Sequence, residues 1–409
     1  MPAASGPAML EGVTILELGG VIAGNFGGVI LADLGAEVIK IEPKTGDTAR
    51  NPTIAPYRDH SAVHLFMNRG KKSVVLDLKS DEGLAIIHRL VEQADVVVDN
   101  FRPGVLARLG IDHDSLKATN PEIITVSITG FGETGLLRDK AAFDLVIQAY
   151  SGHMSITGDP DGAPSRIGAP MADMSGAVYG AISILAALVG RELHGTGQHV
   201  DVAMLDSMVH LLAYDALDYL TTGNTASRHG SAHAHMVPWQ AFPASDGHVV
   251  VAARDEKFWL NLCDAIGRED LKSDLRTADN AARLANREWL VPQLEVAFAA
   301  RTKAEWVQIL DEFDIPAAPV NDFHDLFEDP QIQDRRMVRT YDHPTLGPIR
   351  YQPSPMKVAG WEFPNRHAPM LGEHTRDILV ERLDYHPDAV DHLARSGVIG
   401  LWPGPPTSQ

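Results

Sequence analysis

The fold of this 409-residue chain is decided by residues 13–42, VTILELGGVIAGNFGGVILADLGAEVIKIE. The stretch starts with a short β-favouring run, 13–18, which ends at a pair of glycines. Residues 21–34 then carry apolar side chains at helical spacing, and residues 37–42 form a second run of strand length. A strand, a helix and a second strand in this order predict a βαβ unit with parallel strands.

The same alternation continues beyond this unit. Further strands are predicted at 73–78, 95–99, 123–128, 199–204 and 247–252, and helices at 81–94, 172–193, 205–220, 256–266, 280–300, 303–314 and 372–396. Residues 223–238 are predicted to be a loop, 323–334 a polar linker, and 402–409 an extended or disordered tail. The pattern predicts an α/β fold, with a Rossmann-like large domain, a mostly parallel sheet and a middle unit near 225–325.

Composition narrows the class of protein. The formal net charge is -19, which argues against nucleic acid as a partner, because phosphate backbones attract basic surfaces. Cys263 is the single cysteine, so no intrachain disulfide can form, which suits a reducing compartment. The first residues do not resemble a signal peptide, and no uninterrupted apolar stretch reaches the roughly 18 residues of a membrane span. We therefore expect a cytoplasmic protein.

Three segments near predicted strand ends could bind a phosphorylated ligand. Residues 19–24, GGVIAG, form either a simple tight turn or a set of exposed backbone amides before a helix. Residues 67–79 carry four basic side chains and one acidic one, which makes them either a solvated edge strand or a phosphate-binding patch. Residues 100–110 add two arginines after another strand. Together the segments favour an anionic, phosphorylated ligand.

Asp173 is the strongest candidate for a reactive group. It lies in the run 167–176, IGAPMADMSG, among small and apolar side chains at the predicted start of a helix. One interpretation is an N-cap, because aspartate is a preferred capping residue. The other is a shielded carboxylate that acts as a nucleophile toward an acyl group.

The sequence lacks the motifs of three other classes of active site, namely zinc sites, serine hydrolases and nicotinamide-dependent oxidoreductases. His229, His233 and His235 have no cysteine or carboxylate at a spacing typical of zinc sites, so no metal is expected. The serines Ser151 and Ser175 lack the G-x-S-x-G elbow of serine hydrolases. The glycines of the first turn do not have the spacing of the dinucleotide fingerprint, which argues against a nicotinamide-dependent oxidoreductase.

Taken together, an ordered set of strings resembles the class III coenzyme A transferases and the related α-methylacyl-CoA racemases. The strings run in family order from residue 10 to about 400. They are LEGV at 10–13, LGAEVIKIE at 34–42, NRGKKS at 68–73, NFRPG at 100–104, SITGFG at 127–132, Asp173 with Gly176, GTGQ at 195–198 and APMLGEHT at 368–375. Each string alone is weak, and the specificity lies in the set.

The resemblance implies site residues. It assigns the catalytic role to Asp173, with Asp144 as a second acidic residue, and coenzyme A as a substrate without any prosthetic group. The implied CoA contacts are Ile22, Ala23, Leu76, Lys79, Arg108 and Leu109. Some relatives have an arginine near the adenine directly after the IKIE string, where this chain has Pro43 followed by Lys44.

The two branches of this family differ in chemistry. The racemases use a histidine–aspartate pair, whereas this chain has Phe143 before Asp144, and a phenyl ring cannot carry a proton. His153 is ten residues further on. Transferase is therefore the favoured function and racemase the alternative. A CoA-binding protein without catalysis and a cofactor-free lyase or isomerase also remain open.

Within the transferases, residues 229–242 resemble the branch that moves CoA between dicarboxylates, with succinyl-CoA as donor. A second substrate carboxylate would be bound by Arg228, His233 or Gln240. The resemblance further implies an interlocked homodimer with no membrane or nucleic-acid partner. It divides the chain into a large CoA-binding domain, 1–224, a small α+β domain, 225–325, and a linker with C-terminal part, 326–409, that returns to the large domain.

Overall fold

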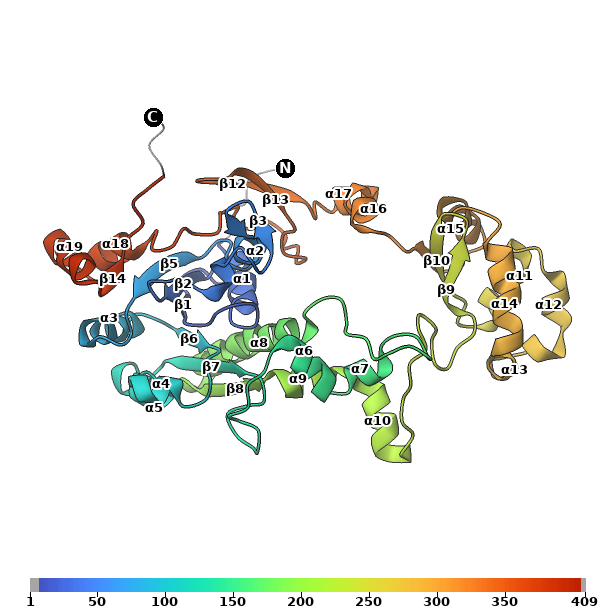
Figure 1. Ribbon diagram of the computed structural model, residues 1–409, viewed down its shortest axis with the longest axis horizontal. Coiled ribbons are helices and arrows are strands. Elements are labelled where there is room, and N and C mark those ends of the chain that lie inside the picture. Colours follow the sequence, from blue (N-terminus) through green and yellow to red (C-terminus); the bar gives the residue numbers. More distant parts are fainter. Residues whose placement is uncertain (1–6, 406–409) are drawn as a thin grey trace. The chain divides into compact units, whose positions relative to one another are not determined.

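The structure is a computed structural model that describes residues 7–405 (Figure 1). The chain divides into two compact units. The first comprises Met1–His153, Ile167–Gly223 and Arg335–Gln409, and the second comprises Met154–Arg166 and Asn224–Asp334. The N-terminal and C-terminal parts of residues 7–405 therefore belong to one unit, while the assignment of functional domains made from the sequence stays a prediction.

A seven-stranded sheet forms the centre of the first unit, in the order β14-β5-β2-β1-β6-β7-β8. Its strands are β14 (Ile399–Gly400), β5 (Lys72–Leu76), β2 (Glu37–Glu42), β1 (Thr14–Glu17), β6 (Val96–Asp99), β7 (Ile124–Thr129) and β8 (His199–Ala203). All neighbours pair in parallel except β14, which is antiparallel to β5. The predicted α/β class with a mostly parallel sheet is confirmed.

Helices cover both faces of the sheet, and neighbouring side chains of each strand point to opposite sides, so each strand contributes to two cores. In β1, Leu16 belongs to a core that includes apolar residues of α3 (Asp81–Val91) and α19 (Pro387–Ser396). Ile15 belongs to the opposite core, which includes α1 (Phe26–Asp33) and α8 (Met171–His194). This arrangement explains why the strands appear as continuous apolar runs in the sequence.

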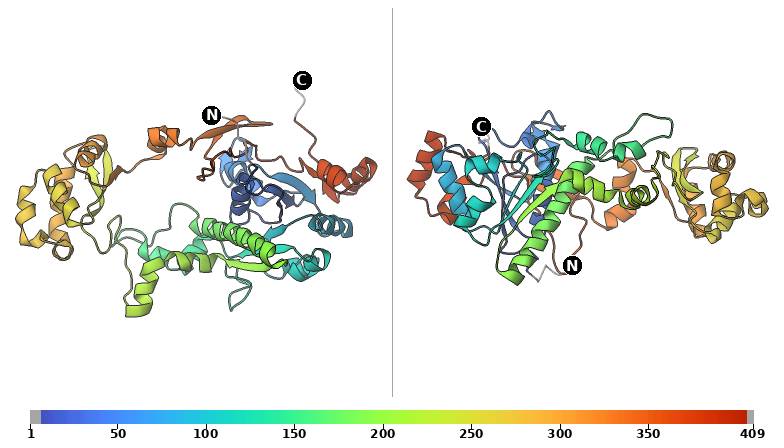
Figure 2. Two further views of the ribbon diagram at one scale, coloured as in Figure 1. Left: turned by 180° about the vertical axis from the view of Figure 1, so that it is seen from behind. Right: turned by 90° about the horizontal axis from the view of Figure 1, so that it is seen from below.

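Helix α8 packs against the sheet, where it contacts β7 (Figure 2). A Cβ atom at Gly180 would lie 2.7 Å from Cδ1 of Ile128 in β7, so glycine permits this close approach. By length and composition α8 is the one helix of residues 7–405 that could cross a membrane, but half of its most apolar window is buried inside the protein. A buried core helix passes the same test, and a cytoplasmic location stays a prediction.

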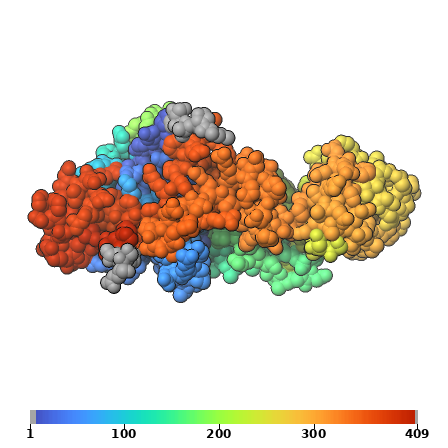
Figure 3. All heavy atoms as spheres, turned by 90° about the horizontal axis from the view of Figure 1, so that it is seen from above, coloured from blue at the N-terminus to red at the C-terminus, as the bar shows by residue number. Residues whose placement is uncertain are grey.

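The C-terminal segments cover the N-terminal ones in the first unit (Figure 3). The amide of His374 donates to the carbonyl of Ser73, and the amide of Asp77 donates to that of Val398. The elements of this region are the hairpin β12 (Arg339–His343) and β13 (Gly347–Tyr351), α18 (Thr375–Asp377) and a π-helical turn, Ile378–Arg382. The last residues, 406–409, lie outside the described part, so the predicted tail is only partly covered.

The second unit has its own core. A three-stranded antiparallel sheet, β11-β10-β9, packs on helices through a cluster that includes Phe242, Trp259, Phe298 and Trp306. The elements are β9 (Trp239–Ala244), β10 (Gly247–Ala252), β11 (Ala317–Pro319), α11 (Glu256–Ala265), α12 (Glu269–Ser273), α13 (Asn280–Ala285), α14 (Arg287–Phe298), α15 (Lys303–Glu312), α16 (Phe323–Glu328) and α17 (Pro330–Asp334).

Several predicted helices are shorter or divided. The helix expected over 21–34 begins at Phe26, because the preceding residues form a turn. The helix expected over 205–220 is divided into α9 (Met204–Leu211) and α10 (Ala213–Thr222), where Ala213 has a left-handed φ of 48°. The expected linker 323–334 contains α16 and α17. The division between α9 and α10 occurs where one residue leaves the helical region, which apolar spacing does not record.

Candidate active site

Asp173 is the third residue of α8 and lies in its first turn. The N-cap position belongs to Pro170, and no side chain caps the helix from that position. The N-cap interpretation of Asp173 is therefore wrong. Among residues 7–405 no hydrogen bond to the Asp173 carboxylate is present, which leaves both of its oxygens available for a substrate.

Asp144 holds the start of α8 from the neighbouring helix α6 (Asp144–Tyr150). Its Oδ1 accepts hydrogen bonds from the amides of Ala172, at 2.8 Å, and Asp173, at 3.3 Å. Gln148 donates to the other oxygen of Asp144, at 2.6 Å. A side chain 29 positions away in the sequence thus does the capping that a local residue usually does.

The carboxylate of Asp173 is unusually basic for an aspartate. Burial raises the pKa of Asp173, and the negative charge of Asp144 raises it further, to about 7. The neighbours Ala172, Ser175 and Gly176 are buried, so little water can solvate the charge. A more basic carboxylate is a stronger nucleophile, and roughly half of it is ionised at neutral pH.

A cavity of about 880 Å³ opens at the ends of strands β1, β2 and β5. Four of the six CoA contacts implied by the sequence line it, namely Leu76, Lys79, Arg108 and Leu109. Ile22 and Ala23 do not line it themselves, but they directly follow Val21, which does. Asp47, Asn100 and Phe101 are lining residues that the sequence did not assign. Asp47 could have been suspected from its position just beyond the IKIE string.

Basic side chains at this cavity come from three segments. Lys44, Lys79 and Arg108 are exposed and line the wall. Lys44 occupies the region where some relatives have an arginine, and its Nζ lies 3.7 Å from Oδ2 of Asp77. Three carboxylates, of Glu42, Asp47 and Asp77, also line the cavity, and the first two are buried. What the cavity offers an anionic ligand is therefore its exposed cationic side chains.

Most of the basic stretch 67–79 has a structural role instead. Arg69 is buried and forms a bidentate ion pair with Asp33, at 2.6 and 2.7 Å. The buried Lys71 bonds both carboxylate oxygens of Glu17, at 2.7 and 2.8 Å. Lys79 alone of the four basic residues lines the cavity. The stretch is thus not a phosphate-binding patch as a whole.

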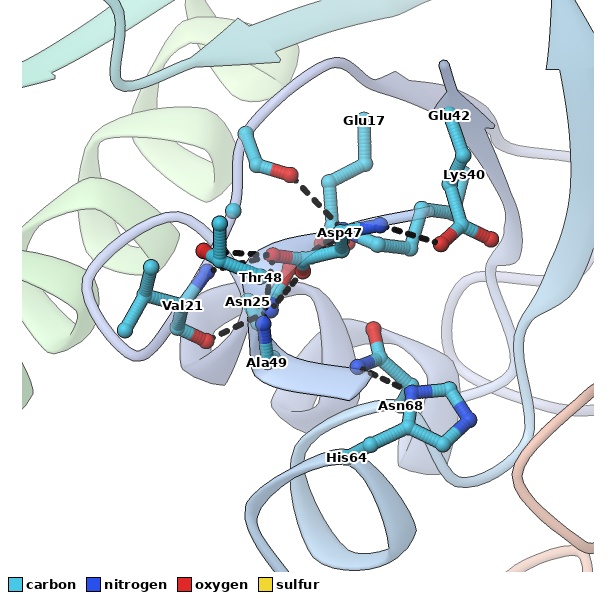
Figure 4. A network of polar contacts seen from close by, with 12 residues as sticks. Glu17, Val21, Asn25, Lys40, Glu42, Asp47, Thr48, Ala49, His64 and Asn68 are labelled. Atoms are coloured by element: carbon cyan, nitrogen blue, oxygen red, sulfur yellow. Dashed lines mark hydrogen bonds and ion pairs between the residues drawn. The ribbon is translucent and has the colours of Figure 1, made fainter. Parts of the chain in front are cut away.

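A network of buried charges includes the cavity-lining residue Asp47 (Figure 4). Lys40 Nζ lies 3.1 Å from Oδ2 of Asp47 and 3.4 Å from Oε1 of Glu17. Burial alone would raise the pKa of Asp47, but Lys40, Asn25 and two backbone amides hold it well below the ordinary value. Lys40 and Asp47 thus form a buried ion pair with further hydrogen-bond partners, which makes them a rigid support.

The three residues expected to bind a substrate carboxylate lie in the second unit. Arg228 donates through Nε to the carbonyl of Asp159 and through Nη2 to those of Pro160 and Gly162. No hydrogen bond of its Nη1 group is present among residues 7–405. The ring of His233 lies 5.0 Å from that of Trp239, and Gln240 is buried in β9. Asp173 and the lined cavity belong to the first unit, and Asp173 is not among the cavity-lining residues.

Other candidate groups have ordinary roles. Phe143, at the position of the racemase histidine, is exposed, and His153 is buried beside Ser151, with 3.0 Å between Nδ1 and Oγ. Cys263 is buried, and burial raises the pKa of its thiol to about 12, which makes it unreactive. Within residues 7–405 no cluster of histidine, cysteine and carboxylate side chains could hold a metal ion.

Comparison with known proteins identifies the family. The model of CoA-transferase family III matches residues 10–375. Succinyl-CoA:mesaconate CoA-transferase of Haloarcula hispanica is 40% identical over 383 residues, covering 91% of this chain and 96% of that protein. Succinate--glutarate CoA-transferase of Agrobacterium fabrum is 37% identical over 381 residues, with 91% and 95% covered. A crystal structure of a CAIB/BAIF family protein from Brucella suis matches with a TM-score of 0.82 at 36% identity, covering 91% and 98%.

The chain therefore belongs to CoA-transferase family III, and it is a CoA-transferase. Such enzymes use CoA thioesters and carboxylates as substrates. The expected family and the expected enzyme class are both confirmed.

Proposed function

We propose that this enzyme moves CoA between dicarboxylates, with succinyl-CoA as donor, through covalent intermediates on Asp173. The observation that carries the proposal is the carboxylate of Asp173, partly buried, without a hydrogen bond from residues 7–405, and with a pKa raised to about 7. The relatives named for mesaconate and glutarate support the class of acids.

The reaction proceeds in four steps. An oxygen of Asp173 attacks the thioester carbonyl of the donor, the C–S bond breaks, and CoA leaves as a thiolate from a mixed anhydride. The thiolate attacks the side-chain carbonyl of Asp173 and releases the donor acid, which leaves an aspartyl-CoA thioester. The acceptor carboxylate attacks that same carbonyl and displaces the thiolate, forming a second anhydride. The thiolate finally takes the new acyl group and regenerates the carboxylate.

Asp144 supports these steps without bonding to the substrate in this proposal. Its hydrogen bonds to the amides of Ala172 and Asp173 fix the first turn of α8, and its charge keeps Asp173 basic. The small buried neighbours limit the access of water, which would hydrolyse an anhydride.

CoA would occupy the cavity in the first unit. Lys44, Lys79 and Arg108 would neutralise its phosphates, while Leu76 and Leu109 provide apolar wall. The amides of Ile22 and Ala23 would donate to an acceptor atom of CoA. The distal carboxylate of the acid would be bound by Arg228, His233 or Gln240, and Nη1 of Arg228, which has no acceptor within residues 7–405, would be a cationic donor.

A homodimer, interlocked in the manner implied by the family resemblance, is part of the proposal. Apolar side chains are exposed along α8 and α10, a pattern that marks an interaction surface. They are Val178, Ile182, Val189, Leu193, Tyr214, Leu217 and Leu220. Light scattering after size-exclusion chromatography should give twice the mass of the 44.3 kDa chain, and a monomer would contradict this part.

Trapping the covalent intermediate tests the central proposal. Incubation with succinyl-CoA, followed by rapid quenching and peptide mass spectrometry, should place a CoA or acyl adduct on the peptide that contains Asp173. Steady-state assays with succinyl-CoA and a panel of acids should favour dicarboxylates such as glutarate or mesaconate. A preference for formate or carnitine would contradict the substrate class, and α-deuterium incorporation from D₂O without transfer would favour the racemase alternative.

A further inference from the structure

A strained residue borders the proposed CoA cavity. Val21 has a left-handed φ of 59° and lines the cavity wall. A β-branched residue rarely adopts this conformation, because its side chain collides with its own backbone. Such a conformation persists only when neighbouring groups hold it.

Asp47 and Asn25 hold Val21 from both ends of its backbone. Oδ1 of Asp47 accepts from the amides of Val21, at 3.1 Å, and Ala49, at 2.9 Å. Nδ2 of Asn25 donates to the carbonyl of Val21, at 2.5 Å, and to Oδ2 of Asp47, at 2.7 Å. The conformation of the turn thus depends on one carboxylate and one amide side chain.

Lys40 contacts both of these side chains (Figure 4). Its Nζ lies 3.1 Å from Oδ2 of Asp47, 2.6 Å from Oδ1 of Asn25 and 2.7 Å from the carbonyl oxygen of Gly19. Lys40 and Asn25 are fully buried, and Asp47 is 9% exposed. Since buried charges keep their geometry when every partner is satisfied, Asp47 cannot easily turn away from Val21.

The turn leaves two amides without partners beside the cavity. The amides of Gly20 and Val21 are bonded to Asn100 and Asp47, respectively. Within residues 7–405 the next two amides, of Ile22 and Ala23, have no acceptor. Backbone amides held in fixed positions are suited to the acceptor oxygens of a phosphorylated ligand.

We propose that Asp47 is a positioning residue for CoA: it holds Val21 in its left-handed conformation so that the amides of Ile22 and Ala23 face the ligand. This inference rests on the proposed function, because it takes CoA as the occupant of the cavity. Asp47 acts through the turn and forms no bond to the reacting atoms.

The test compares Asp47→Asn with a matched control. Asp33→Asn also removes a buried, ion-paired carboxylate, the partner of Arg69, and within residues 7–405 this carboxylate has no hydrogen bond to the turn. In Asp47→Asn an NH₂ group replaces the oxygen that accepts from Asn25 and pairs with Lys40, so the side chain loses the contacts that keep its other oxygen on the amide of Val21. We therefore expect KM for succinyl-CoA to rise about tenfold, with kcat within about threefold and KM for the acceptor acid unchanged. For Asp33→Asn all three constants should stay at the wild-type values. Equal effects of both substitutions on KM would overturn the proposal.

A double substitution tests whether Asp47 acts through Val21. Glycine adopts a left-handed φ without strain, so a turn with Val21→Gly needs less support. We expect Asp47→Asn to raise KM about tenfold in the Val21 background but no more than about threefold in the Val21→Gly background. The same factor in both backgrounds would show that Asp47 acts by another route.

If Asp47→Asn does not fold, hydrogen exchange on the unaltered protein gives the answer. The amide of Val21 should exchange slowly with or without CoA, whereas those of Ile22 and Ala23 should become protected only when CoA is added. Rapid exchange at Val21 in the free protein would overturn the proposal. Failure of the unaltered enzyme to bind CoA or transfer it would instead refute the proposed function, which separates the two outcomes.

Discussion

Two aspartates of the first unit, the partly buried Asp173 and the buried Asp47, differ in their hydrogen bonds, in the charges beside them and in the direction of their pKa shifts. Asp173 has no hydrogen bond from the described residues, lies near the carboxylate Asp144, and has a pKa raised to about 7. Asp47 is bonded by Asn25 and two backbone amides, and its ion pair with Lys40 helps to hold its pKa well below the ordinary value.

The difference shows how one residue type serves two purposes. Burial without a partner disfavours the charged form, so the carboxylate is basic and ready to react. Burial with a full set of donors favours the charged form and makes the same group part of the scaffold. Asp144 combines a structural and an electrostatic role, because it accepts hydrogen bonds from backbone amides while its charge raises the pKa of Asp173.

Transferase activity should depend on Asp173 far more than on Asp47, and this is the largest effect we expect. Asp173→Asn removes the nucleophile, so we expect transfer to fall on the order of 10³- to 10⁵-fold. The exposed Asp139→Asn serves as the control, with activity near that of wild type. Steady-state transfer from succinyl-CoA measures both. Activity of Asp173→Asn within about tenfold of wild type would remove the covalent step from the proposal.

The free energy of unfolding, by contrast, should depend on Asp47 more than on Asp173. Asp47→Asn breaks a buried charge network, and we expect the free energy of unfolding at pH 7 to fall by about 2–4 kcal/mol. Because the folded-state pKa of Asp47 is depressed, its contribution is present above the unfolded value near 3.8 and is lost as the pH falls below it. Denaturant unfolding at pH 7 and at pH 3 should therefore show a smaller difference at pH 3. An equal difference at both pH values would contradict the ion-paired state.

The pH dependence of catalysis should link Asp173 to Asp144. Because Asp173 must be ionised to attack, kcat/KM for succinyl-CoA should rise with pH and level off above about 7. Asp144→Asn removes a negative charge while its side-chain oxygen can still accept from the amides of α8. We expect the midpoint of the rise to move down by about one pH unit. A midpoint that stays in place would show that another group controls ionisation.

The smallest expected effect is a gain in stability. The raised pKa of Asp173 favours folding only while the group is protonated, so this contribution is lost as the pH rises from about 3.8 to about 7. Above that range Asp173→Asn removes a buried, unpaired charge and should stabilise the protein. We expect the melting temperature at pH 8 to rise by about 1–3 °C, with no gain at pH 4. A lower melting temperature at pH 8 would assign Asp173 a structural role.

The sequence predicted the sheet better than the helix ends. Strands such as β2 were found because runs of apolar residues must be buried on both faces of a parallel sheet. The start of α1 was placed five residues early, because the left-handed Val21 depends on Asp47 and Asn25, which no local pattern reveals. In the same way, the basic stretch 67–79 resembled a phosphate site, since its partners Asp33 and Glu17 come from other elements.

By itself the sequence determined the α/β class, the family and the identity of Asp173 as the residue to test, because apolar periodicity and ordered motifs are local properties of the chain. Only the tertiary structure decided that Pro170 is the N-cap residue of α8, that Asp144 bonds the first amides of this helix, and that buried ion pairs neutralise Arg69 and Lys71. The physical reason is that hydrogen bonds and pKa values depend on distances between atoms of separate elements, and these distances exist only in the folded chain.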